Sequence, residues 1–143
     1  MKILCWLMFI GFNSLIMFVL IKKFERAFLM KLFPACVPVI LIVSILPMVI
    51  RWLLHVPSGQ VFRFYFLSIV FSLIIICLTN FVNQVFFYML DEVLSFHRQN
   101  NSANLNRQPI KFFIEHQSGL RLASTIVWFL GSSLMLYGIW LGK

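Results

Sequence analysis

Four long apolar runs constrain this chain more than any other feature. They cover about residues 3–21, 35–55, 63–90 and 122–141. About 20 apolar residues suffice for a helix to cross the hydrocarbon core of a bilayer. A segment in lipid must satisfy its own backbone hydrogen bonds, which favours helices. The sequence therefore predicts an all-α integral membrane protein, a four-transmembrane-helix bundle that forms a single membrane domain over residues 1–143.

The composition excludes several other classes of protein. Hydrophobic residues make up 62% of the 143 residues, and charged residues make up only 11%. An ordinary soluble domain has about 25% charged residues. A soluble domain of this size cannot bury so much apolar surface, because its surface is large relative to its volume. These values exclude a soluble enzyme, a disordered regulator and a secreted disulfide scaffold.

The first apolar run is predicted to be a retained helix rather than a signal peptide. It is longer than the apolar region of a typical signal peptide. The charged segment 22–26 follows it, where a cleavage site would have small residues. We therefore expect the first run to cross the membrane with the other three.

The basic residues predict an orientation. The loops 22–34 and 91–121 contain eight of the twelve Lys and Arg residues. Cytoplasmic loops carry an excess of Lys and Arg, so we expect both loops in the cytoplasm and both termini outside (N-out/C-out). The compact loops and basic clusters favour a bacterial inner membrane. Because this topology accounts for the net charge of +8, we expect the lipid bilayer as a partner and no nucleic acid.

Polar side chains recur on one face of the third run. At about 100° per residue, their spacing gathers them on one broad side of a helix. An amide that faced lipid would be costly, so this face should look into the bundle or toward water. Hydrogen bonding between helices is the favoured interpretation, and a pore or cavity lining is the alternative. The candidate polar face contains Ser68, Ser72, Asn80, Asn83, Gln84 and Asp91, with Asn13 of the first run as the expected partner at the same depth.

Small residues in the fourth run form a candidate packing seam. Ser124, Gly131 and Gly138 are spaced by seven residues, which keeps them on one slowly drifting side of a helix. Small side chains let helix backbones approach closely in lipid. The sequence leaves two interpretations open, namely packing within one chain and a homo-oligomer interface.

Pro47 lies near the middle of the second run and is a candidate kink. Proline donates no backbone hydrogen bond, so the carbonyl of Val43 would lose its helical partner. Such kinks can serve gating, but neighbouring groups usually satisfy the freed carbonyl. We therefore favour a static shape feature.

The segment 91–121 is the only sizeable polar piece between the runs. Residues 91–96 are able to extend the third helix, and residues 99–108 are rich in Asn and Ser, which is typical of a flexible linker. Apolar residues after Pro109 recur at helical spacing and predict a short amphipathic helix on the inner leaflet. The candidate partner-docking residues are Asp91, Glu92, Phe96, Ile110, Phe113 and Ile114.

Several chemistries have no residues to carry them. Every Asp and Glu falls in a loop or at the end of a run, whereas proton-coupled transport usually needs an ionisable group within the membrane. The cysteines lie inside apolar runs without metal-ligand spacing. There is no Gly-rich phosphate loop and no nucleophile elbow. We expect no enzyme activity, no catalytic residues, no cofactor and no metal.

Three functions remain after these exclusions. The leading hypothesis is a non-enzymatic membrane anchor or sensor subunit, which docks a membrane or cytosolic protein through the 91–121 loop. The first alternative is a homo-oligomeric channel or pore lined by the polar face of the third helix. The second is an immunity or phage-defence membrane component, which no residue specifies.

Overall fold

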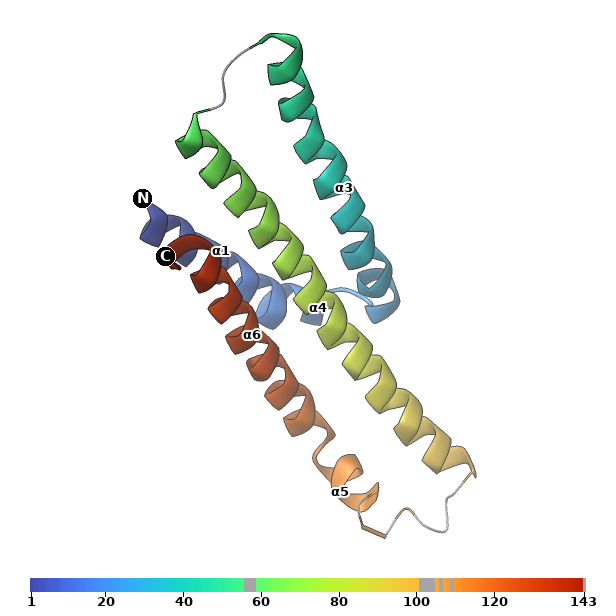
Figure 1. The fold of residues 1–143 in the computed structure, drawn as a ribbon. Helices are drawn as coiled ribbons and strands as arrows, with labels where there is room; N and C mark the ends of the chain where they lie inside the picture. The colour runs from blue at the N-terminus through green and yellow to red at the C-terminus, as the bar shows by residue number, and fades with distance from the viewer. Residues whose placement is uncertain (56–58, 101–104, 106, 109, 143) are drawn as a thin grey trace.

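The protein is helical and has four helices of membrane-spanning length. The computed structural model describes residues 1–55, 59–100, 105, 107–108 and 110–142 (Figure 1). Every regular element in these ranges is a helix. Four of the helices are long and apolar enough to cross a membrane. This confirms the all-α class and the four long apolar helices predicted from the apolar runs.

The first span contains a short π-helix. π-Helical turns are rare, and they occur mostly as single turns within α-helices. The elements of the chain, in order, are α1 (Lys2–Leu15), the π-helix η1 (Ile16–Leu20), α2 (Ile21–Lys23), α3 (Arg26–Leu53), α4 (Gln60–Asn100), α5 (Ile110–Glu115) and α6 (Gln117–Leu141).

The helices extend beyond the apolar runs. The second helix begins at Arg26 instead of about residue 35, and the fourth begins at Gln117 instead of about residue 122. The third continues to Asn100, so most of the described part of the 91–121 segment is helical rather than loop. Apolar length measures only the part of a helix that needs lipid, whereas backbone hydrogen bonding continues into the polar ends.

The helix α3 is continuous through its prolines. Pro34, Pro38 and Pro47 all lie inside it. Proline lacks the backbone N–H that would bond the carbonyl four residues earlier. In lipid, neighbouring groups can satisfy such carbonyls. Pro47 therefore does not end α3. The kink at Pro47 and its role stay predictions.

The long helices pack in a chain of neighbours in which α3 contacts α4, α4 contacts α6, and α6 contacts α1 (Figure 1). The beginning of α1 and the end of α6 meet the beginning of α4. The ammonium of Lys2 lies 4.5 Å from the centre of the Phe64 ring, and the rings of Phe64 and Trp140 are 6.3 Å apart. At the other end, α5 and the last turns of α4 extend past the turn between α2 and α3 (Figure 1).

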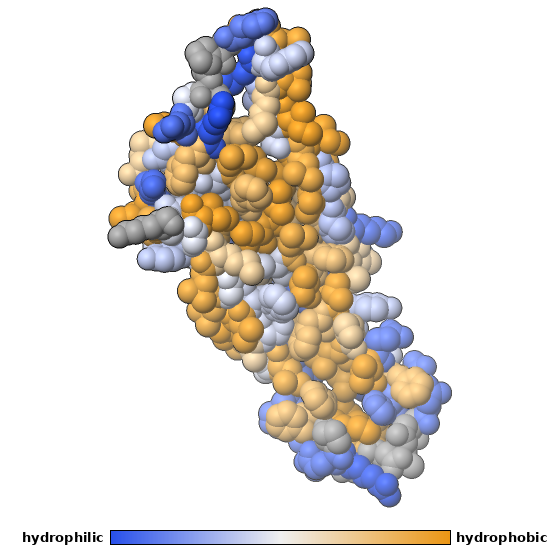
Figure 2. Space-filling model, viewed as in Figure 1, coloured by the Kyte–Doolittle hydropathy of each residue, from blue (hydrophilic) through white to orange (hydrophobic). Residues whose placement is uncertain are grey.

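On the face shown in Figure 2, apolar side chains predominate in the middle, while the most hydrophilic residues gather mainly toward the two ends. Many large apolar residues of α3 and α6 are exposed, among them Ile42, Val127 and Leu134. A water-soluble protein rarely exposes apolar surface of this extent. The distribution suits a chain whose middle is surrounded by lipid.

Candidate functional site

The polar face of α4 is buried against α1 and α6. Ser72, Asn80 and Asn83 are 0% exposed, Gln84 is 1% exposed, and Asn13 of α1 is 0% exposed. Buried polar groups need hydrogen-bond partners, especially where no water is available. The partners of this face lie mainly on neighbouring helices.

Asn13 joins three helices at the centre of this face. Its Nδ2 donates to Ser132 Oγ of α6 at 2.7 Å. Asn80 Nδ2 of α4 donates to Asn13 Oδ1 at 3.0 Å and to the carbonyl of Ile76 at 2.7 Å. The structure thus places Asn13 beside an amide of the third span, at the depth expected. Sequence reasoning did not predict Ser132 as a hydrogen-bond partner of Asn13, although its similar depth in the fourth run was a signal.

A second group of contacts joins α4 to α6 nearer the α5 end. Asn83 Nδ2 donates to Thr125 Oγ1 at 3.3 Å, and Ser124 Oγ donates to Asn83 Oδ1 at 3.0 Å. At the opposite end, the indole of Trp140 donates to Ser72 Oγ at 2.9 Å. Trp140 is fully buried and serves as a helix-packing residue that sequence reasoning did not identify.

The small-residue seam does not pack as a unit within one chain. Ser124 faces α4, as its bond to Asn83 shows. A Cβ atom added to Gly131 or Gly138 would meet nothing within 4 Å among the described residues. Within the described residues, no other helix of the chain therefore packs closely against these two glycines. The homo-oligomer interpretation of the seam stays a prediction.

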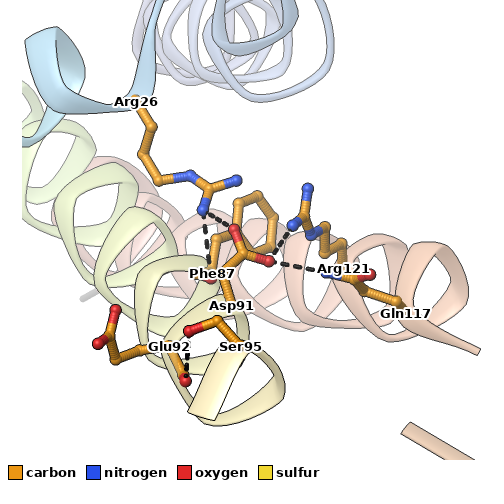
Figure 3. A network of polar contacts seen from close by, with 7 residues as sticks. All are labelled: Arg26, Phe87, Asp91, Glu92, Ser95, Gln117 and Arg121. Carbon is orange, nitrogen blue, oxygen red and sulfur yellow. Dashed lines mark hydrogen bonds and ion pairs between the residues drawn. The ribbon is translucent and has the colours of Figure 1, made fainter. Parts of the chain in front are cut away.

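Asp91 gathers three side chains at the end of the polar face (Figure 3). It forms ion pairs with Arg26, the first residue of α3, and with Arg121 of α6. Gln117 Nε2 donates to Asp91 Oδ1 at 2.7 Å. Both guanidinium groups also lie within 6 Å of the Phe87 ring centre, a distance at which cations and aromatic faces attract. Asp91 therefore ties α3, α4 and α6 together.

The other candidate docking residues lie beyond this ion-pair cluster. Glu92 is exposed and points away from Asp91 (Figure 3). The exposed ring of Phe96 packs edge-on against His97 at 5.7 Å. Ile114 borders a pocket of about 350 Å³ beside Arg98. Residues 101–104, 106 and 109, which include much of the predicted linker and Pro109, lie outside the described residues.

Ile110 and Phe113 of α5 lie against the end of α4. Together they border an apolar groove of about 340 Å³. The structure thus brings together part of the predicted docking set with residues of α4 that sequence reasoning did not single out. The lining residues of this α4–α5 groove are Phe86, Met89, Leu90, Val93, Leu94, His97, Ile110 and Phe113.

No group of three or more His, Cys, Asp or Glu side chains suited to a metal ion occurs among the described residues. The chain matches no protein-family model, no curated protein sequence and no solved structure. The polar face, the Asp91 cluster and the α4–α5 groove are the candidate functional features of the described residues.

Proposed function

We propose that the protein is a non-enzymatic membrane subunit that docks a partner protein at the α4–α5 groove. The four long helices would anchor it in the bilayer. The observation that carries this proposal is an apolar groove at the end of α4, next to polar segments of the chain. Among the described residues that line it, His97 is the only polar one, and Val93 and Phe113 are 53% and 39% exposed.

The length of α4 supports a position of the groove near the membrane surface. From Arg63 to Asp91 the helix rises about 42 Å at 1.5 Å per residue, which exceeds the hydrocarbon core of about 30 Å. The last nine residues of α4 then extend about 14 Å past the Asp91 cluster. The α4 residues of the groove run from Phe86 to His97, on both sides of Asp91, and exposed apolar patches mark interaction surfaces.

Charge beside the groove indicates the chemistry of the partner. Arg98 and Lys111 border the neighbouring pocket together with Glu115, and Arg107 is exposed nearby. Lys111 lies 3.8 Å from the carboxylate of Glu115, so Arg98 and Arg107 supply the net positive charge. We propose a partner helix with an apolar face for the groove and acidic residues beside it.

Site-specific crosslinking in the native host tests the docking proposal. Phe113 and Phe112 are adjacent and similarly exposed, but the Phe112 ring stacks on His116 at 4.5 Å and does not line the groove. A photo-activated residue at position 113 should give a discrete crosslinked protein, and one at position 112 should not. The change Arg98→Glu should weaken that product.

The mass of the gently solubilised complex gives a second measurement. If a partner docks, the complex should contain protein mass beyond whole multiples of the 16.8 kDa chain. Phe113→Ser should reduce this additional mass, and Phe112→Ser should retain it. The same product from positions 112 and 113, or crosslinks only to lipid or to a second copy, would overturn the proposal.

A homo-oligomeric channel is the alternative proposal. The open surface at Gly131 and Gly138 favours contact between copies, because small residues permit close helix packing. Burial of the amides of α4 supports a helix-packing role for them instead of a pore lining. Ion conductance in reconstituted bilayers that changes with Asn83→Leu would favour the channel. An immunity or defence role stays a prediction that neighbouring genes can test.

A further inference from the structure

Another pocket, distinct from the α4–α5 groove, opens beside the Asp91 cluster. It has a volume of about 490 Å³ and is bordered by η1, α2, the first residue of α3, α4 and the beginning of α6. The apolar part of its lining consists of Met17, Phe18, Ile21, Phe24, Phe87 and Leu122. We call it the basic pocket, and its polar lining consists of Lys22, Arg26, Gln84, Ser118, Arg121 and Thr125.

The basic pocket has an excess of positive charge. Lys22, Arg26 and Arg121 line it, and Asp91 is the carboxylate paired with the two arginines. The net charge of this group of four is therefore +2. A guanidinium has five N–H donors, and Arg121 Nε is buried with no hydrogen-bond partner among the described residues. Donors thus remain for an anion after Asp91 has been bound.

Gln84 adds a buried polar group to the wall of the pocket. Its side chain is 1% exposed, and its Nε2 has no hydrogen-bond partner in the described ranges. A buried donor without an acceptor is unfavourable, and such groups in native proteins call for an explanation. Gln84 precedes Asp91 by two helical turns, so it lies about 10 Å deeper along α4. An acceptor oxygen from a ligand would satisfy it.

We infer that the basic pocket binds an anionic phospholipid. Its phosphate would lie against Lys22 and Arg121, an oxygen of the glycerol ester region would accept from Gln84 Nε2, and an acyl chain would follow the apolar lining. Phosphate groups suit the planar donors of arginine. A lipid fits better than free phosphate, because the apolar lining has no role toward an inorganic ion. This site does not depend on the docking proposal.

Titration of the purified full chain in a neutral detergent tests this inference. Native mass spectrometry would compare short-chain phosphatidylglycerol, short-chain phosphatidylcholine and inorganic phosphate. We expect phosphatidylglycerol to bind about tenfold more tightly than phosphatidylcholine, and inorganic phosphate to bind weakly. Equal affinity for the two lipids overturns the site. Inorganic phosphate bound as tightly as phosphatidylglycerol overturns the lipid as its occupant.

Matched variants separate the pocket from general surface charge. Lys22→Gln and Gln84→Leu should each weaken phosphatidylglycerol binding several-fold. Lys31→Gln removes the same charge as Lys22→Gln from an exposed position outside the pocket, and it should leave the affinity unchanged. An equal loss in Lys31→Gln overturns the inference.

Removing the carboxylate should have the opposite effect. Asp91→Asn leaves Arg26 and Arg121 without their anionic partner, so phosphatidylglycerol should bind more tightly although the protein is less stable. A purely structural role for the three groups predicts no such gain. Weaker binding in a folded Asp91→Asn variant counts against the site. Phe113→Ser, outside the pocket, should not change lipid affinity, which keeps this test separate from that of the docking proposal.

Discussion

Ser132 on α6 accepts a hydrogen bond of 2.7 Å from Asn13 on α1, across 119 residues of sequence. Asn80 on α4 donates to the same Asn13 side chain. In lipid, apolar side chains gain little by exchanging lipid contacts for protein contacts, so polar bonds and close packing select which helices become neighbours. The Asn13 group therefore helps to define the α1–α4–α6 arrangement.

We expect Ser132→Ala to destabilise the protein more than Ser133→Ala. Both hydroxyls donate to the carbonyl of Phe129, but only Ser132 also accepts a bond from Asn13. Ser132→Ala should lower the free energy of unfolding by about 0.6 to 1.7 kcal/mol, the average and the largest value for interhelical hydrogen bonds in a membrane protein. Ser133→Ala should change it by less than about 0.5 kcal/mol. Reversible unfolding in bicelles measures both values.

A double-mutant cycle assigns the effect to the pair. The change Asn13→Leu removes the donor, and Ser132→Ala removes the acceptor. If the bond carries the effect, the double variant should lose less stability than the sum of the single losses. Strict additivity would contradict a direct Asn13–Ser132 interaction.

Asp91→Asn is expected to loosen the junction of α3, α4 and α6. The change removes the charge from two ion pairs and leaves two arginines close together. The paired side chains are 28–33% exposed, so water screens the interaction and the expected loss is about 1 to 2 kcal/mol, below that for a fully buried pair. The same unfolding measurement applies. Glu92→Gln, at the exposed neighbouring position, should be nearly neutral, and a similar loss there would contradict this role for Asp91.

Apolar length and helical periodicity predicted the spans and the polar face of α4, because both are properties of a single helix. Hydrogen-bond partners across helices were harder to predict, since they depend on rotation and depth of two helices at once. Ser132 and Trp140 illustrate this limit. Trp140 near the end of an apolar run resembles an interfacial aromatic, yet its indole is buried and bonded to Ser72.

The basic residues show a second limit of the sequence. Arg26 and Arg121 are two of the eight basic residues that the positive-inside rule already explains. Their presence in the sequence therefore did not predict that they pair with an acidic residue. Asp91 lies 65 and 30 residues from them. Their convergence depends on α3 and α6 packing on the same end of α4, which no local pattern encodes.

The contact between α3 and α4 can be tested with native cysteines. Cys36 of α3 and Cys77 of α4 line the same apolar cavity. In a Cys5→Ser variant, a membrane-permeant oxidant should join Cys36 and Cys77 in a disulfide. Neither thiol should then react with an alkylating reagent. In Cys36→Ser, Cys5 and Cys77 should stay reactive. Mass spectrometry after alkylation counts the free thiols, and two free thiols in oxidised Cys5→Ser would contradict the observed packing.

The orientation of the bundle decides which compartment the α4–α5 groove can serve. Lys22, Arg26 and Arg121 lie at the end of the bundle that leads to α5, and Arg51 stacks on Phe62 at 4.2 Å at the other end. By the positive-inside rule we expect the α5 end in the cytoplasm. In a cysteine-free chain, Gln60→Cys should react with an impermeant maleimide on intact cells, and Lys111→Cys should react only in inverted vesicles. The reverse pattern would place the groove outside the cell, so that only an external partner could reach it.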